Sequence, residues 1–360
     1  MKITRGVCTV LVAAGMFSSW AANWIAADGE YPVEANWNNN VKPSATDRAY
    51  MGDGGIMRIP ATVSETMPRF CVARGTVYMQ GGEIRMTQTQ YPLYFGDYGR
   101  AGTLYMESGT FAAEGPFYGA WGGDCAVYQT GGLLSMKGTS YISVSDGVDC
   151  SCRYECSGGE FRQTGKSVVL CPNNRGTAEL VLQDEGLFNL ADTTDGLRFG
   201  AGTARMHVYL KTGGTLVTPL VKSSDINGSS FVFDGGVIRV AADSASASDF
   251  LQGTGYRVAS GGLIFDTNGQ DATCTPDFVA DGDCGGFEKR GLGVLTMSGD
   301  LSCMTGTAVR AGKYVAASPA QLPGWNTGCV RIESGAVLKV GGAWKPEEWQ
   351  LLLETATILP

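Results

Sequence analysis

The sequence has one histidine, little charge and no helical periodicity. His207 stands alone among 360 residues, and 17% of the residues are charged. There is no G-x-S-x-G elbow to make a serine nucleophile, so a Ser-His-Asp centre is not expected. The net charge of −8 argues against nucleic acid as a partner, because phosphate contacts need clusters of Lys and Arg. Apolar residues nowhere follow a spacing of 3, 4 and 7 for long enough to form helical repeats.

Glycine is abundant instead, with 52 residues, and it recurs at steps of 22–28 residues along most of the chain. The repeat is clearest at 93–113, LYFGDYGRAGTLYMESGTFAA, where short alternating strands are separated by tight turns. A period in the twenties indicates a solenoid, whereas a propeller blade needs roughly 40–50 residues. We therefore predict an all-β, right-handed single-stranded parallel β-helix of about ten coils. The marker glycines are Gly82, Gly109, Gly132, Gly159, Gly186, Gly214, Gly236, Gly262, Gly312 and Gly335.

The start of the chain has the pattern of a signal peptide. Lys2 and Arg5 precede an apolar stretch at 7–17, and a small-x-small motif ends at Ala21. This stretch is too short for a membrane span, and no later transmembrane segment is expected. The protein is thus predicted to be secreted or displayed at the cell surface.

The residues at both ends of the repeat are expected to close the solenoid. An open first coil needs an edge cover, so Trp24 and Trp37 are interpreted as a hydrophobic lid, with a sugar-binding pair as the alternative. Residues 346–353 begin with proline and acidic residues, which favours a short capping helix. The predicted segments are a signal peptide at 1–21, an N-terminal cap at 22–60, the β-helix at 61–340 and a C-terminal cap or truncated end at 341–360.

Five tyrosines take the same place in their coils if some turns contain one extra residue. Stacked strands lie about 4.8 Å apart, so these residues would form a ladder. The ladder either stabilises the sheet by ring stacking or presents a strip to sugars. These tyrosines are Tyr78, Tyr105, Tyr128, Tyr154 and Tyr209.

Ten cysteines follow the signal peptide, an even number that permits disulfides in an oxidising compartment. Cys125 and Cys152 are one coil apart, as are Cys303 and Cys329, so each pair could be stacked and bonded. Ladders of buried free thiols are the alternative. The spacing around Cys150, Cys152 and Cys156 lacks a CxxC pair or a histidine, so no metal and no cofactor are expected.

Acidic residues supply the remaining candidates for chemistry. The segment 266–283 has five aspartates, which suit calcium, but their spacing fits no known calcium loop, and a solvated loop is expected. Some β-helix enzymes cleave polysaccharides with paired carboxylates. Such pairs would be Asp192 with Asp195, or Glu155 with Glu160.

Residues 285–318, GGFEKRGLGVLTMSGDLSCMTGTAVRAGKYVAAS, resemble the autotransporter-associated β-strand repeat of Gram-negative surface proteins. The resemblance implies one coil of a right-handed β-helix in an autotransporter passenger. The usual Asn and Tyr after the Ser-Gly pair are replaced around 300–304, and no set of alternating strands for a membrane barrel follows. The matching residues are Gly286, Lys289, Gly291, Gly293, Leu295, Thr296, Ser298, Gly299, Thr305, Gly306, Thr307, Val309 and Gly312.

Together these patterns predict an exported structural or adhesive surface protein without catalysis, which displays side-chain ladders and loops. Its partner would be a polysaccharide or a ligand on a host or cell surface. The alternative is a β-helix that binds or cleaves polysaccharides, since this fold carries both kinds of function.

Overall fold

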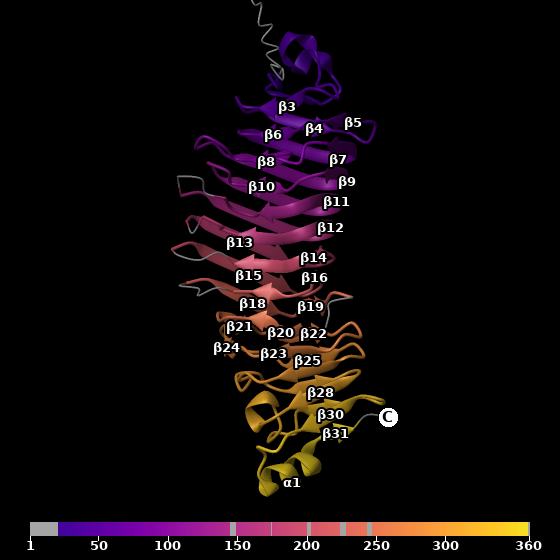
Figure 1. The fold of residues 1–360 in the computed structure, drawn as a ribbon, viewed down its shortest axis with the longest axis vertical. Coiled ribbons are helices and arrows are strands. Elements are labelled where there is room, and N and C mark those ends of the chain that lie inside the picture. The colour runs from indigo at the N-terminus through magenta and orange to yellow at the C-terminus, as the bar shows by residue number, and fades with distance from the viewer. Residues whose placement is uncertain are drawn as a thin grey trace, which may run out of the picture.

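The computed structural model describes residues 21–144, 149–173, 175–199, 203–223, 228–242 and 247–358. It confirms the all-β solenoid, in which strands make up 54% of the structure (Figure 1). The parallel sheet winds through about 13 turns rather than the ten predicted, because both ends predicted as caps also contain strands of the solenoid. The predicted signal peptide lies outside the described residues apart from Ala21, and it stays a prediction. Within the described residues, no helix has the length and apolar character needed to cross a membrane.

The strands form three faces, A, B and C, and most coils contribute to all three; each strand pairs with the strand of the same face one coil away. Face A contains β2 (Asp28–Glu30), β4 (Ile56–Ile59), the first parts of β7 (Gly75–Met86), β9 (Gly102–Ala113), β11 (Cys125–Tyr141) and β12 (Ser151–Leu170), then β13 (Thr177–Leu182), β15 (Arg205–Lys211), β18 (Ser230–Asp234), β21 (Tyr256–Val258) and β24 (Phe278–Ala280).

Face B follows in each coil. It contains β5 (Ser64–Met67), the later parts of β7, β9, β11 and β12, the first part of β14 (Leu187–Phe199), then β16 (Thr215–Thr218), β19 (Val237–Val240), β22 (Leu263–Asp266), β25 (Phe287–Arg290), β27 (Thr307–Val309), β29 (Val330–Ile332) and β31 (Thr357–Ile358).

Face C completes the coil. It contains β1 (Ala21–Asn23), β3 (Arg48–Met51), β6 (Phe70–Val72), β8 (Leu93–Phe95), β10 (Phe117–Gly119), the ends of β11, β12 and β14, then β17 (Val221–Lys222), β20 (Ala247–Gln252), β23 (Ala272–Cys274), β26 (Val294–Met297), β28 (Lys313–Ala316) and β30 (Val337–Val340).

The marker glycines from Gly82 to Gly262 lie at the corners between faces A and B, whereas Gly312 and Gly335 lie between faces B and C. Gly109 has a φ of +85° and Gly132 a φ of +73°, a region that L side chains rarely adopt. A Cβ on Gly132 would also lie 2.6 Å from the carbonyl oxygen of Gly109 in the coil before it. These corners therefore need glycine both for the turn and for the close approach of successive coils.

The solenoid begins earlier than the sequence suggested. β1 pairs with β3 and β2 with β4, so residues 22–60, predicted to be a separate cap, already contain strands of the first coils. Trp24 and Trp37 are buried, and their rings pack edge to face 5.3 Å apart, with Tyr31 against Trp37. This confirms the hydrophobic lid, which also includes the 3-10 turns η1 (Glu34–Asn36) and η2 (Asn38–Asn40).

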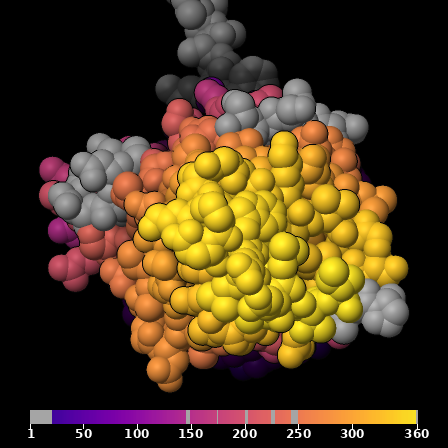
Figure 2. All heavy atoms as spheres, turned by 90° about the horizontal axis from the view of Figure 1, so that it is seen from below, coloured from indigo at the N-terminus to yellow at the C-terminus, as the bar shows by residue number. Residues whose placement is uncertain are grey.

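The C-terminal end is closed differently. Face A has no described strand after β24, and its place is taken by turns, by η3 (Pro319–Gln321) and by α1 (Pro346–Thr355). The helix confirms the predicted one: Pro346 opens it, and Glu348 accepts a hydrogen bond from the Lys345 amide at 2.8 Å. Figure 2 shows the last residues covering this end of the solenoid.

Candidate functional site

The tyrosine ladder on face A exists, but it has three members in contact. Tyr78 and Tyr105 stack with ring centroids 4.9 Å apart, and Tyr105 and Tyr128 stack at 5.1 Å. Parallel stacking covers the ring faces, so the outer surface consists of ring edges and hydroxyls. Arg58 lies over Tyr78, with 5.7 Å between its guanidinium carbon and the ring. This geometry suits stabilisation of the sheet more than stacking of a sugar on an open ring.

Tyr154 does not belong to this ladder. Its partner in the preceding coil is Val127, whereas Tyr128 faces Glu155, so the predicted alignment was wrong by one residue. A shift of one residue turns a side chain from the outer face to the core. Tyr154 is therefore fully buried, and its hydroxyl donates to Gln129 Oε1 at 2.6 Å. Tyr209 keeps the ladder position but is separated from Tyr128 by Glu155 and Val181.

A second group of aromatic side chains lies on face C, and we call Tyr91, Tyr118, Trp121 and Tyr141 the aromatic cluster. Tyr118 of β10 lies 5.0 Å from Tyr91, 5.1 Å from Trp121 and 5.3 Å from Tyr141 between ring centroids. None of these contacts is a parallel stack, and Tyr91 is 37% exposed. Tilted, half-exposed rings leave parts of their faces open to a ligand.

The backbone around the aromatic cluster is strained. Tyr91 has a φ of +53°, Tyr98 of +51° and Ala120, directly before Trp121, of +49°. Bulky residues rarely adopt this region, and such strain concentrates at functional sites. The loop of Tyr98, a residue 80% exposed, is tied to the loop of Trp121 by a bond from the Gly99 amide to the Gly122 carbonyl.

Polar groups accompany the aromatic cluster. The guanidinium carbon of Arg69 lies 5.9 Å from the Tyr91 ring, and Arg69 also donates to Gln88. Burial, then the neighbouring Tyr141 and Tyr91, raises the pKa of Tyr118 to about 12. Its hydroxyl therefore keeps its proton at neutral pH and stays available as a hydrogen-bond donor.

Three of the four predicted carboxylates lie beside arginines, and Glu155 and Glu160 are on different faces. Glu155 lies on face A and Glu160 on face B, on either side of the corner at 158–159. Arg153 contacts Glu155 at 2.7 Å, Arg162 contacts Glu160 at 2.8 Å, and Arg198 lies 3.7 Å from Asp195. Asp192 pairs along the backbone with Thr164 on the same face as Glu160. His207 lies on face A, with Nδ1 3.0 Å from the Ser230 hydroxyl.

The cysteines are arranged only partly as predicted. Cys125 and Cys152 are partners in adjacent coils, but Cys329 faces Gly306 rather than Cys303. The partner of Cys303 is Cys284, whose Sγ lies 3.6 Å away. Within the described residues, no disulfide joins any of these cysteines.

The acidic segment 266–283 is not a loop, because it contains β23 and β24. Asp266 binds Arg239 at 2.8 Å, Asp271 accepts from the Val294 amide at 2.8 Å, and Asp277 accepts from the Asp300 amide at 2.7 Å. The aspartates therefore link coils together. Across the described part of the chain, no three His, Cys, Asp or Glu side chains gather as metal ligands.

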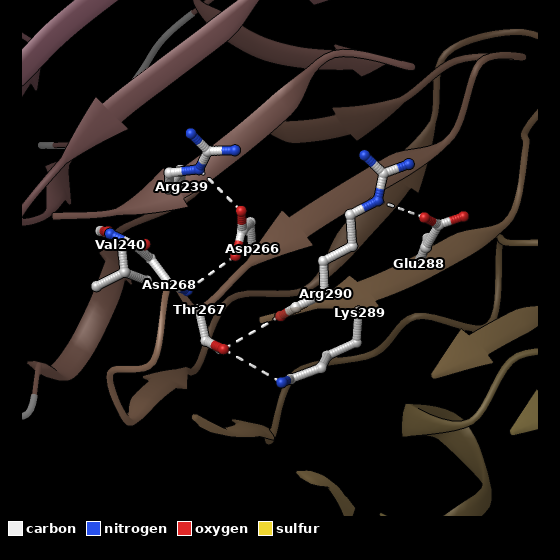
Figure 3. Close-up of polar contacts among 8 residues, drawn as sticks. All are labelled: Arg239, Val240, Asp266, Thr267, Asn268, Glu288, Lys289 and Arg290. Carbon is white, nitrogen blue, oxygen red and sulfur yellow. Dashed lines mark hydrogen bonds and ion pairs between the residues drawn. The ribbon is translucent and has the colours of Figure 1, made fainter. Parts of the chain in front are cut away.

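Lys289 is the buried charge of this region. Its Nζ donates to Thr267 Oγ1 at 3.2 Å and to the carbonyl oxygens of Gly291, Gly293 and Ala311, the last two at 2.7 and 2.9 Å. Figure 3 shows Lys289 pointing toward Thr267, while Arg239 and Arg290 bind Asp266 and Glu288 nearby. The ammonium group of Lys289 thus links three successive coils.

The aromatic cluster was missed in the sequence because Tyr91 and Trp121 lie in turns outside the periodic strands. The chain matches no protein-family model, no curated protein and no solved structure. The resemblance of residues 285–318 to the autotransporter-associated repeat thus rests on the sequence motif alone.

Proposed function

We propose that this protein is an exported structural or adhesive solenoid that binds polysaccharide through the aromatic cluster on face C, without cleaving it. The observation that carries the proposal is the open, tilted packing of Tyr91, Tyr118 and Trp121 on a strained backbone. The apolar C–H face of a sugar ring suits the electron-rich face of an aromatic ring. Tyr118 and Arg69 supply hydrogen-bond donors beside it.

The dimensions also support an extended ligand. Tyr94, Tyr118 and Tyr141 occupy equivalent positions of three successive coils. At about 4.8 Å per coil they extend about 10 Å along the axis, longer than one sugar ring. A linear polysaccharide running along the solenoid would cross several of these rings. The rigid sheet holds the rings in place before binding, which lowers the entropy lost on association.

Affinity electrophoresis through gels that contain acidic or neutral polysaccharides tests this proposal. We expect at least one polysaccharide to retard the protein, Trp121→Ala to lose most of the retardation, and Tyr105→Ala, on face A, to keep it. Reducing and unsaturated ends are measured in the same incubations. New reducing or unsaturated ends would show that the protein cleaves the polysaccharide. Retardation that survives Trp121→Ala would show that the aromatic cluster is not the binding site.

A further inference from the structure

Cys284 and Cys303 lie side by side where face A loses its strands. Cys284 stands between β24 and β25, and Cys303 lies in the turn segment 298–306 of the next coil. Their Sγ atoms are 3.6 Å apart, and a disulfide joins such atoms at about 2.05 Å, so a small movement is enough. Both side chains are partly exposed, so an oxidant in solution reaches them.

Backbone hydrogen bonds tie the two ends of this turn segment to the coil before it. The Ser298 amide donates to the Cys274 carbonyl and the Asp300 carbonyl accepts from the Phe278 amide, both at 2.9 Å, while the Thr305 amide donates to the Gly285 carbonyl at 3.1 Å. Between them, the Leu301 amide donates to Ala320 of the following coil and the Met304 amide to Leu301, so the middle of the segment around Cys303 is held less closely to the preceding coil. The equivalent segments of earlier coils are strands with a continuous ladder, such as β21 on β24. A covalent link here would replace the hydrogen bonds that a strand would have made.

We propose that Cys284 and Cys303 form a disulfide when the folded protein meets a disulfide oxidant, and that this bond fixes the segment 298–306 on the coil before it. With glutathione disulfide as oxidant, the Cys303 thiolate attacks one glutathione sulfur and releases one glutathione thiolate. Cys284, after losing its proton to water, attacks the Cys303 sulfur of the mixed disulfide and releases the second. Two protein thiols are oxidised, and one glutathione disulfide is reduced to two thiols.

The hydrogen bond between the thiols sets the order of these steps. Cys284 donates to the Cys303 sulfur, which stabilises a thiolate on Cys303 and not on Cys284. Burial, and then Cys303, raises the pKa of Cys284 to about 12. Burial raises the pKa of Cys303 as well, but the hydrogen bond from Cys284 lowers it, so Cys303 is the first nucleophile. The inference does not depend on glycan binding.

The test uses the full chain carrying Cys329→Ser, because exposed Cys329 would otherwise link two molecules. The reduced protein is incubated with glutathione disulfide, unfolded, alkylated and mapped by mass spectrometry. We expect a cross-linked peptide pair containing Cys284 and Cys303. Adding Cys284→Ser should leave Cys303 alkylated or carrying glutathione, whereas adding Cys125→Ser, at a different pair, should keep the cross-link.

Amide exchange supplies a second readout that needs no further variant. Oxidation should slow exchange in 298–306 at least about tenfold and leave face C of the first coils unchanged. Alkylation of both Cys284 and Cys303 after oxidation of a protein with a native circular dichroism spectrum would overturn the disulfide. Unchanged exchange in a cross-linked protein would overturn its role in fixing the segment.

Discussion

The N-terminal and C-terminal coils share one backbone ladder but carry different outer surfaces. The first coils display rings, in the Tyr78–Tyr105–Tyr128 ladder and the aromatic cluster. Ion pairs occur in both regions, such as Lys137 with Glu114 in the first coils and Arg310 with Glu288 and Glu333 on face B of the later coils. Ring pairs contribute about 0.5–1.5 kcal/mol each and exposed ion pairs about 0–1 kcal/mol. On the proposed function, recognition belongs to the aromatic coils, whereas ion pairs contribute cohesion between coils in both regions.

The largest expected effect comes from the aromatic core of the N-terminal coils. Tyr154→Ala should lower the free energy of unfolding by about 3–5 kcal/mol, because a large buried ring leaves a cavity beside Phe161 and Phe188. Tyr154→Phe, which loses only the bond to Gln129, should cost about 1–2 kcal/mol. Urea unfolding followed by amide exchange measures both. Equal effects would show that the hydroxyl, not the ring, supports these coils.

The matching test in the C-terminal coils removes the buried ammonium. Lys289→Met should destabilise the surrounding coils by about 2–4 kcal/mol, because the carbonyls of Gly293 and Ala311 lose their donor. Exposed Lys339→Met is the control, with a change within about 0.5 kcal/mol. Amide exchange in β25 and β28 reports the loss. Unaltered exchange there would contradict the cohesive role of Lys289.

Alkaline pH should weaken the N-terminal coils through their buried thiols. Burial raises the pKa of Cys156 to about 12 from an ordinary value of 9.0. Above pH 9 the unfolded chain loses this proton while the folded chain keeps it, so stability present below pH 9 falls as the pH rises. The loss approaches about 1.4 kcal/mol per pH unit above pH 9, or about 2 kcal/mol between pH 9 and 11. Urea midpoints of Cys156→Ala should fall less steeply over this range, and identical slopes would refute the linkage.

The smallest effects compare the two outer surfaces directly. Tyr105→Ala removes two ring stacks and should cost about 1–2 kcal/mol. Glu288→Gln removes contacts with Arg290 and Arg310 at the surface and should cost less than about 1 kcal/mol. Raising the salt concentration should reduce only the second effect. A larger loss from Glu288→Gln would reverse the ranking of rings and ions.

The repeat period revealed the coils because each corner needs glycine, as at Gly132, and each strand alternates. The period could not fix the register, since the extra turn residue that the alignment allowed is absent here. Tyr128 pairs with Glu155, so Tyr154 takes the core position of Val127. The aromatic cluster escaped prediction because Tyr91 and Trp121 come from non-periodic turns. Cys303 meets Cys284 because a turn segment takes the place of a face A strand after β24. The wide spacing between Gly262 and Gly312 shows that the repeat is irregular there but not which strand is absent.

Footprinting with hydroxyl radicals, in the presence of the polysaccharide that retards the protein, tests most directly whether recognition belongs to the aromatic coils. The account predicts that Tyr91, Tyr118, Trp121 and Tyr141 become protected, while exposed Trp349 of the C-terminal helix is modified at an unchanged rate. Protection confined to the C-terminal coils, or no polysaccharide that binds at all, would contradict it.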